Sequence, residues 1–347
     1  MTRNNYVDFC RGIAAVNIVF IHTTFWSGTY YVPVWMQSVS LLLDVPFFFF
    51  LAGWGRAYSP SISRTFRSLV LLYGKYCFFI SALFLFLKLS GLSDFHFSDY
   101  LATLSFIGAE PTLLPVVMGS MWFMPELFTV VPLCIIVIHC ISSTPSKCRE
   151  SAFKLSVLIG FILYLWSMMG FNYLFLSRQT LFYCLFFLIG YCSFWRSITR
   201  KQFFTVISAL VIASLIIASL LDVDITCLQN LKFPPHIVYF LLSLLSVTFA
   251  VFFKDRFSPS HQNWFVIIGK NAIWFYYAQG ISSSLIFYLT NRLSCFWGIK
   301  LMICALVNIL LTAVIAFLLA YLYRRFSQIL AIAVDNIHPK ERTIQRP

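Results

Sequence analysis

Charged residues are scarce in this chain of 347 residues, at only 11%. A soluble globular domain carries roughly 25% charged residues, which cover much of its surface. So few charges exclude a soluble enzyme. A disordered chain is excluded too, because 60% of the residues are hydrophobic and Phe alone occurs 39 times.

Polar–apolar alternation, which a transmembrane barrel requires, is also missing. The apolar residues instead form continuous runs of about 20, the length that crosses a bilayer as a helix. These runs predict an all-α, polytopic integral membrane helical bundle of about ten transmembrane helices. The expected spans lie near 9–29, 37–56, 68–89, 121–140, 153–172, 179–195, 203–221, 235–253, 264–290 and 296–323. We interpret residues 1–330 as a single transmembrane domain and 331–347 as a short basic cytoplasmic tail.

Metal-ligand and disulfide patterns are absent from the sequence. None of the ten cysteines belongs to a Cys-x-x-Cys motif or a Cys/His pair with metal-ligand spacing. We therefore expect no bound metal and no disulfide framework. No small-residue cleavage site follows the first apolar run, which we interpret as an uncleaved first helix.

The net charge of +13 would suggest a nucleic-acid partner in a soluble protein. Here the basic residues follow the connectors between the spans. With the N-terminus placed in the cytoplasm, 17 Lys and Arg lie in cytoplasmic connectors and 5, including Lys232, in the opposite ones. This asymmetry predicts that both termini are cytoplasmic. The basic residues then orient the chain in the lipid bilayer, and no nucleic-acid partner is expected.

Two polar residues interrupt the first expected span, where a charge is costly. Arg11 and His22 are 11 residues apart, which places them on one helix face, roughly 16 Å apart along the axis. Asp8 lies one turn before Arg11 and can pair with it. Such a face can take an anionic donor from the cytoplasm and use the imidazole as a base. The alternative is that Arg11 anchors the topology and His22 is a hydrogen-bonded core residue.

The segment NYVDFCRGIAAVNIVFIH resembles the first helix of the acyltransferase 3 family. The hallmark of that helix is an Arg, ten residues and then a His, with an Asp three residues before the Arg. Three later stretches resemble family motifs in the same order: VPFFFFLAGW (45–54), MWFMPELF (121–128) and IGKNAIWFYYAQ (268–279). The chain departs from the family at Ala52 and Ala272, which replace Ser, and at Gln279, which replaces His.

This resemblance implies a membrane O-acyltransferase that takes an acyl group, by default acetyl, from cytoplasmic acyl-CoA. The acceptor is then a hydroxyl of a cell-surface or lipid-linked glycan, such as a lipopolysaccharide O-antigen, and the setting a bacterial inner membrane. Acyl-CoA is a co-substrate, and we expect no permanently bound cofactor. The expected catalytic residues are His22, Arg11 and Asp8. The expected donor-binding residues are Arg64, Arg67 and Lys270, and the expected acceptor-binding residues are Glu126, Trp122 and Asp44.

Two other classes share this composition. A polytopic transporter or flippase of glycans or lipid-linked precursors also places charges at mid-membrane depth, but such proteins often show paired halves with broken helices. A polysaccharide polymerase is expected to place its essential Arg and His residues in a large outer loop. Neither feature is visible in the sequence.

The distribution of basic residues predicts the topology directly. A reporter fused after Arg325 should read out as cytoplasmic, and a reporter inserted within residues 95–115 should lie on the opposite side. A cytoplasmic readout for the inserted reporter would contradict the predicted topology.

Overall fold

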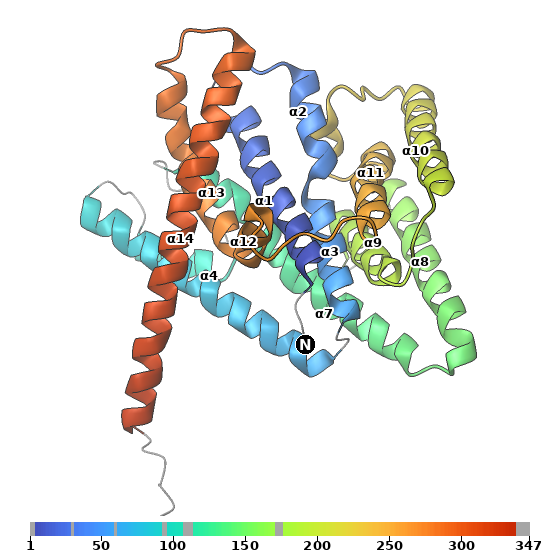
Figure 1. Ribbon diagram of the computed structural model, residues 1–347, viewed down its shortest axis with the longest axis horizontal. Coiled ribbons are helices and arrows are strands. Elements are labelled where there is room, and N and C mark those ends of the chain that lie inside the picture. The colour runs from blue at the N-terminus through green and yellow to red at the C-terminus, as the bar shows by residue number, and fades with distance from the viewer. Residues whose placement is uncertain are drawn as a thin grey trace, which may run out of the picture.

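The computed structural model describes residues 4–28, 31–58, 61–91, 96–106, 114–170 and 176–337, and these ranges form helices and no strand (Figure 1). The first half contains α1 (Asn5–Trp26), α2 (Val34–Ser40), η1 (Leu41–Leu43), α3 (Val45–Ala57), α4 (Ile62–Ser90), α5 (Phe97–Leu104), α6 (Pro115–Ser120) and α7 (Phe123–Ser142). The second half contains α8 (Ser146–Met168), α9 (Arg178–Ser193), α10 (Arg200–Leu220), η2 (Leu228–Leu231), α11 (Ile237–Phe253), α12 (Trp264–Lys270), α13 (Ala272–Thr290) and α14 (Trp297–Ile337).

The predicted helical membrane bundle is confirmed. Seven segments are long and apolar enough to cross a membrane, namely α1, α2 to α3, α4, α7, α8, α10 and α14. The other three expected spans correspond to the shorter helices α9 and α11 and to the pair α12 and α13. The number of ten spans and the cytoplasmic position of both termini stay predictions. Residues 338–347 of the expected basic tail lie outside the described residues.

Two of the expected spans are broken by a polar residue. The second is interrupted at Asp44, which has an extended backbone and precedes α3 as its N-cap, with Pro46 in the first turn. The ninth is interrupted at Asn271, whose side-chain amide donates to the Ile267 carbonyl at 2.9 Å. This local bond competes with the regular helical ladder and separates α12 from α13.

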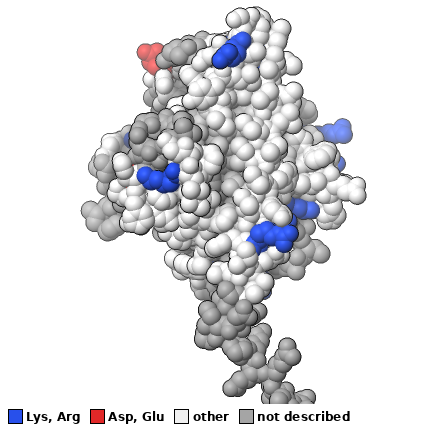
Figure 2. Space-filling model, turned by 90° about the vertical axis from the view of Figure 1, so that its left-hand side faces the viewer, with Lys and Arg blue, Asp and Glu red and all other residues white. Residues whose placement is uncertain are grey.

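The outer surface suits a lipid environment. Large apolar side chains are exposed along α4, α8, α10 and α14. Figure 2 shows one face of the molecule on which the surface is mostly uncharged and Lys and Arg form only isolated patches. A soluble monomer rarely exposes so large an apolar area, because its contact with water is unfavourable. Contact of the same area with lipid hydrocarbon carries no such penalty.

Glycines allow two pairs of helices to approach each other with backbones in contact. An added Cβ at Gly53 on α3 would overlap the Phe187 carbonyl of α9, and one at Gly190 on α9 would overlap the Phe50 carbonyl of α3. Between α1 and α12, Gly12 and Gly269 have the same relation to the opposite backbone. Small residues at such crossings are a general device for packing helices within membranes.

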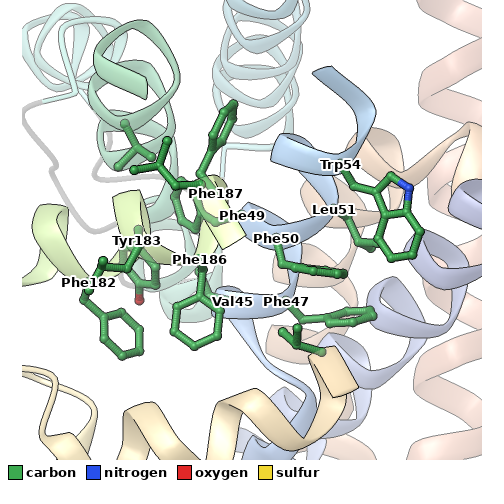
Figure 3. Close-up of a cluster of buried hydrophobic side chains, with 14 of the residues drawn as sticks. Val45, Phe47, Phe49, Phe50, Leu51, Trp54, Phe182, Tyr183, Phe186 and Phe187 are labelled. Carbon is green, nitrogen blue, oxygen red and sulfur yellow. The ribbon is translucent and has the colours of Figure 1, made fainter. Parts of the chain in front are cut away.

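Aromatic side chains fill the space around the crossing of α3 and α9 (Figure 3). The rings of Phe49 and Tyr183 stack with their centroids 4.4 Å apart, and both residues are fully buried. The Phe-rich stretch at 45–54 is therefore a packing surface, and it holds the two ends of α3 in fixed positions.

The crossing of α3 and α9 generates a stability prediction. Gly53→Ala should lower the thermal unfolding midpoint of the detergent-purified protein, because overpacking costs about 1–3 kcal/mol. Gly74→Ala on α4 is the matched control, since no atom lies within 4 Å of the added methyl group. Equal midpoints for the two variants would show that the crossing tolerates a side chain.

Candidate active site

The two ends of α3 lie against the two polar residues of α1. An added Cβ at Gly55, near the end of α3, would lie 2.8 Å from the Arg11 guanidinium. Asp44, at the start of α3, lies within electrostatic range of His22. Arg11, which comes early in α1, thus lies beside the end of α3, whereas His22, which comes late in α1, lies near its start. The two helices therefore run antiparallel here.

Asp8 and Arg11 form an ion pair at the N-terminal end of this face. The Arg11 Nη1 atom lies 3.2 Å from the Asp8 Oδ1 atom. Asp8 is fully buried, whereas the Arg11 side chain is 31% exposed. The buried carboxylate fixes the guanidinium while leaving part of it accessible, which suits recognition of a phosphate or carboxylate.

A second ion pair lies beside His22. The Lys232 Nζ atom is 2.6 Å from the Asp44 Oδ2 atom, and the Tyr239 hydroxyl donates to the same oxygen at 2.8 Å. Lys232 follows η2 and belongs to a connector that the sequence places on the outer side. In the structure only 7% of Lys232 is exposed. Its charge also lies within electrostatic range of His22.

Three buried polar atoms around this pair have no hydrogen-bond partner among the described residues. They are His22 Nδ1, Asp44 Oδ1 and the Tyr183 hydroxyl. Tyr183 also lies within electrostatic range of Asp44 and Glu126. Buried polar atoms are nearly always paired in folded proteins, so a cluster of unpaired ones indicates the place of a polar ligand or of ordered water.

The three residues expected to bind an acceptor lie around this cluster. The Lys232 ammonium lies 5.5 Å from the centroid of the Trp122 ring, and that ring stacks against Tyr183 at 6.2 Å. Trp122 and Glu126 both line a cavity of about 340 Å³. The Glu126 carboxylate accepts a hydrogen bond from Thr180 at 3.1 Å. Asp44, Trp122 and Glu126 thus contribute to one polar region inside the bundle.

The three expected donor residues are distributed over two places. Lys270 lines a cavity of about 670 Å³ together with Lys254, His261 and Tyr58. Tyr58 lies within electrostatic range of Arg11, and burial raises the pKa of its phenol, which keeps the group a neutral hydrogen-bond donor.

Arg64 and Arg67 lie on the exposed first turns of α4 and are not among the residues that line this cavity. Arg56 lies within electrostatic range of Arg11, and its guanidinium donates to the Ser68 hydroxyl at 2.6 Å.

Sequence reasoning missed Lys232, Tyr183, Tyr239 and Lys254. Lys232 resembles an ordinary connector lysine, and the tyrosines resemble core or interfacial aromatics. The only local signal is the setting of Lys232 between Leu231 and Phe233-Pro234-Pro235, which is unusually apolar for an exposed lysine. Gln279, at a position where the chain departs from the family pattern, is 1% exposed, and both of its amide atoms lack a partner among the described residues.

These features define a polytopic helical membrane protein with a polar centre inside its bundle. Residues 4–325 match the family model described as an acyltransferase domain, that of the acyltransferase 3 family. The chain therefore belongs to the acyltransferase 3 family, as its motifs predicted, and is a membrane acyltransferase. Neither the curated proteins nor the solved structures gave a match. The family favours acyl transfer over transport or polymerisation.

The ion pair beside His22 makes a testable prediction about stability. Asp44→Asn should lower the free energy of unfolding by about 3–5 kcal/mol, because it leaves Lys232 buried without a countercharge. Asp44→Asn combined with Lys232→Met should recover much of this loss. The measurement is the thermal unfolding midpoint of the purified protein.

The exposed pair of Glu150 and Lys154, joined at 2.9 Å, provides the control. Glu150→Gln should leave the midpoint unchanged, since water screens a surface pair. The assignment of a buried pair would be wrong if Asp44→Asn and Glu150→Gln behaved alike.

Proposed function

We propose that the protein is an O-acyltransferase that moves an acyl group, by default acetyl, from cytoplasmic acyl-CoA to a hydroxyl of a glycan. The acceptor is a cell-surface or lipid-linked saccharide, and the setting is a bacterial inner membrane. The observation that carries the proposal is the polar face of α1. This face leads from Arg11, beside the cavity lined by Lys254 and Lys270, to His22 within the unpaired polar cluster.

The donor end of this face suits the phosphates of coenzyme A. Lys254 and Lys270 line the cavity and supply positive charge, and Tyr58 supplies a neutral donor. Arg11 does not line the cavity but lies within electrostatic range of Tyr58 and adds its charge from there. Arg guanidinium groups bind phosphate oxygens through two parallel hydrogen bonds, which lysine cannot do. Arg64 and Arg67, exposed at the start of α4, add positive charge on the approach rather than in the cavity. The acyl end of the donor then extends between α1 and α3 toward His22.

The other end of the face suits a sugar. Asp44 Oδ1 and the Tyr183 hydroxyl have no partner within the part of the chain that the structure describes, and both can bind the hydroxyls of a saccharide. Trp122 and Glu126 line the adjoining cavity of about 340 Å³. An aromatic ring beside a carboxylate offers one apolar face for the sugar ring and one acceptor for its hydroxyls.

The proposed chemistry is a single acyl transfer. His22 takes the proton of the acceptor hydroxyl while its oxygen attacks the thioester carbonyl, and a new carbon–oxygen bond forms. The carbon–sulfur bond then breaks, and the proton passes to the leaving thiolate of coenzyme A. Negative charge develops on the carbonyl oxygen during this step. Lys232 lies within range of His22 and can stabilise that charge.

His22→Gln tests the assignment of the base. It should reduce acyl transfer about 10²- to 10⁴-fold, the usual contribution of a general base. Binding of acyl-CoA should persist, because the phosphates are held at the other end of the face. In the wild type the transfer rate should also fall as acidification protonates the imidazole, since a protonated base cannot accept a proton. The measurement is thiol release from acetyl-CoA against pH, with donor binding recorded in parallel.

Arg11 provides the complementary control. Arg11→Ala should weaken donor binding, and Arg11→Lys should restore it only in part. Near-normal transfer by correctly inserted His22→Gln protein would overturn the mechanism. Unchanged donor affinity in Arg11→Ala would remove Arg11 from the donor site.

A further inference from the structure

A separate cavity of about 960 Å³ lies where α7, α8 and α9 meet. It is bounded by the last residue of α7, the first turns of α8, the end of α9 and the segment that follows α9. The cavity shares no lining residue with the donor cavity or with the cavity at Glu126. Nothing in the acyl-transfer proposal uses it.

The lining is basic. Arg149, Lys154 and Arg196 line the cavity together with one carboxylate, Glu150, which pairs with Lys154, so the lining carries a net charge of +2. The Arg149 guanidinium donates to the Ser142 carbonyl at 2.9 Å, which fixes it at the end of α7. A guanidinium fixed in this way beside two further cations is an arrangement that suits a phosphate group.

Three aromatic residues, Phe153, Tyr191 and Trp195, also line the cavity. The rings of Phe153 and Tyr191 stack with centroids 5.1 Å apart, and Trp195 meets Tyr191 edge-on at 5.2 Å. Trp195 is 62% exposed. Tyr and Trp favour the level of the lipid headgroups, because one end of each ring is apolar and the other is polar.

The position of the cavity fits that level. It lies at the ends of α7 and α9 and at the beginning of α8, the side that the basic residues predict to be cytoplasmic. The exposed apolar side chains of α8, Leu155, Leu158, Ile159 and Ile162, lie on the other face of this helix, which suits contact with hydrocarbon. A phosphate held in the cavity would therefore lie at the end of a lipid-facing helix, at the level of the headgroups.

We propose that this cavity binds the headgroup of an anionic phospholipid from the cytoplasmic leaflet. The phosphate lies among Arg149, Lys154 and Arg196, the glycerol lies against Tyr191 and Trp195, and the acyl chains extend into the surrounding bilayer. Basic pockets between transmembrane helices on the cytoplasmic side are a recurring means of holding such lipids.

The test uses the full-length protein reconstituted with phosphatidylcholine alone or with added phosphatidylglycerol. The retained lipid is counted by native mass spectrometry after mild delipidation. Phosphatidylglycerol should be retained in preference to phosphatidylcholine. Lys154→Gln combined with Arg196→Gln should weaken that retention roughly tenfold, because each basic residue near the surface contributes to attraction of an anionic headgroup. Lys147→Gln combined with Arg200→Gln is the matched control, since these exposed cations lie on the same side but do not line the cavity.

An equal loss in the control variant would show general surface attraction and overturn the proposal, as would equal retention of the two lipids. Competition by free glycerol 3-phosphate at the same concentration as the lipid would instead indicate a site for a soluble phosphate compound. Acyl-transfer activity is recorded separately, so a failure of the lipid site leaves the acyltransferase proposal intact, and the reverse is also true.

Discussion

The cost of burying charge in a low-dielectric bundle shapes the centre of this molecule. Asp44 and Lys232 are both almost fully buried, and neither is tolerable there without the other. Their pairing brings the connector after η2 into the bundle and joins it to the start of α3. It also places two fixed charges within electrostatic range of His22, and a hydrogen bond from Tyr239 to Asp44 joins α11 to the pair. One electrostatic requirement thus connects α1, α3, α11 and a connector that would otherwise lie at the surface.

Backbone packing supplies the complementary constraint. At the glycine crossings of α1 with α12 and of α3 with α9 the backbones are in contact, which fixes the position of each helix relative to its partner. Gly12, Gly53 and Gly269 each belong to a stretch that resembles a family motif. In these stretches the polar residues supply the reactive and binding groups, and the glycines set the distances between the helices that carry those groups. The motifs therefore specify geometry as well as reactivity.

Much of the fold follows from the sequence, because the exclusion of polar backbone from hydrocarbon makes each long apolar run a helix. The placement of Arg11 and His22 against the same neighbouring helix likewise follows from their spacing. The breaks at Asp44 and Asn271 were harder to foresee, since each is one polar residue in an apolar run. Lys232 and Tyr183 were not predictable, because the sequence does not show which side chains of distant segments meet. An ion pair between distant segments produces no periodic pattern in the sequence of either segment.

The length of α14 has a mechanical consequence. Its 41 residues span roughly 60 Å at the rise of an α-helix, about twice the thickness of a bilayer core. Its C-terminal end projects past the other helices on the side where the N-terminus lies (Figure 1). The helix is therefore longer than a perpendicular crossing of the bilayer core requires, and its last turns still expose large apolar side chains, namely Ile329, Leu330 and Ile332. A tilt of α14, or contact of these turns with the membrane interface, would cover them.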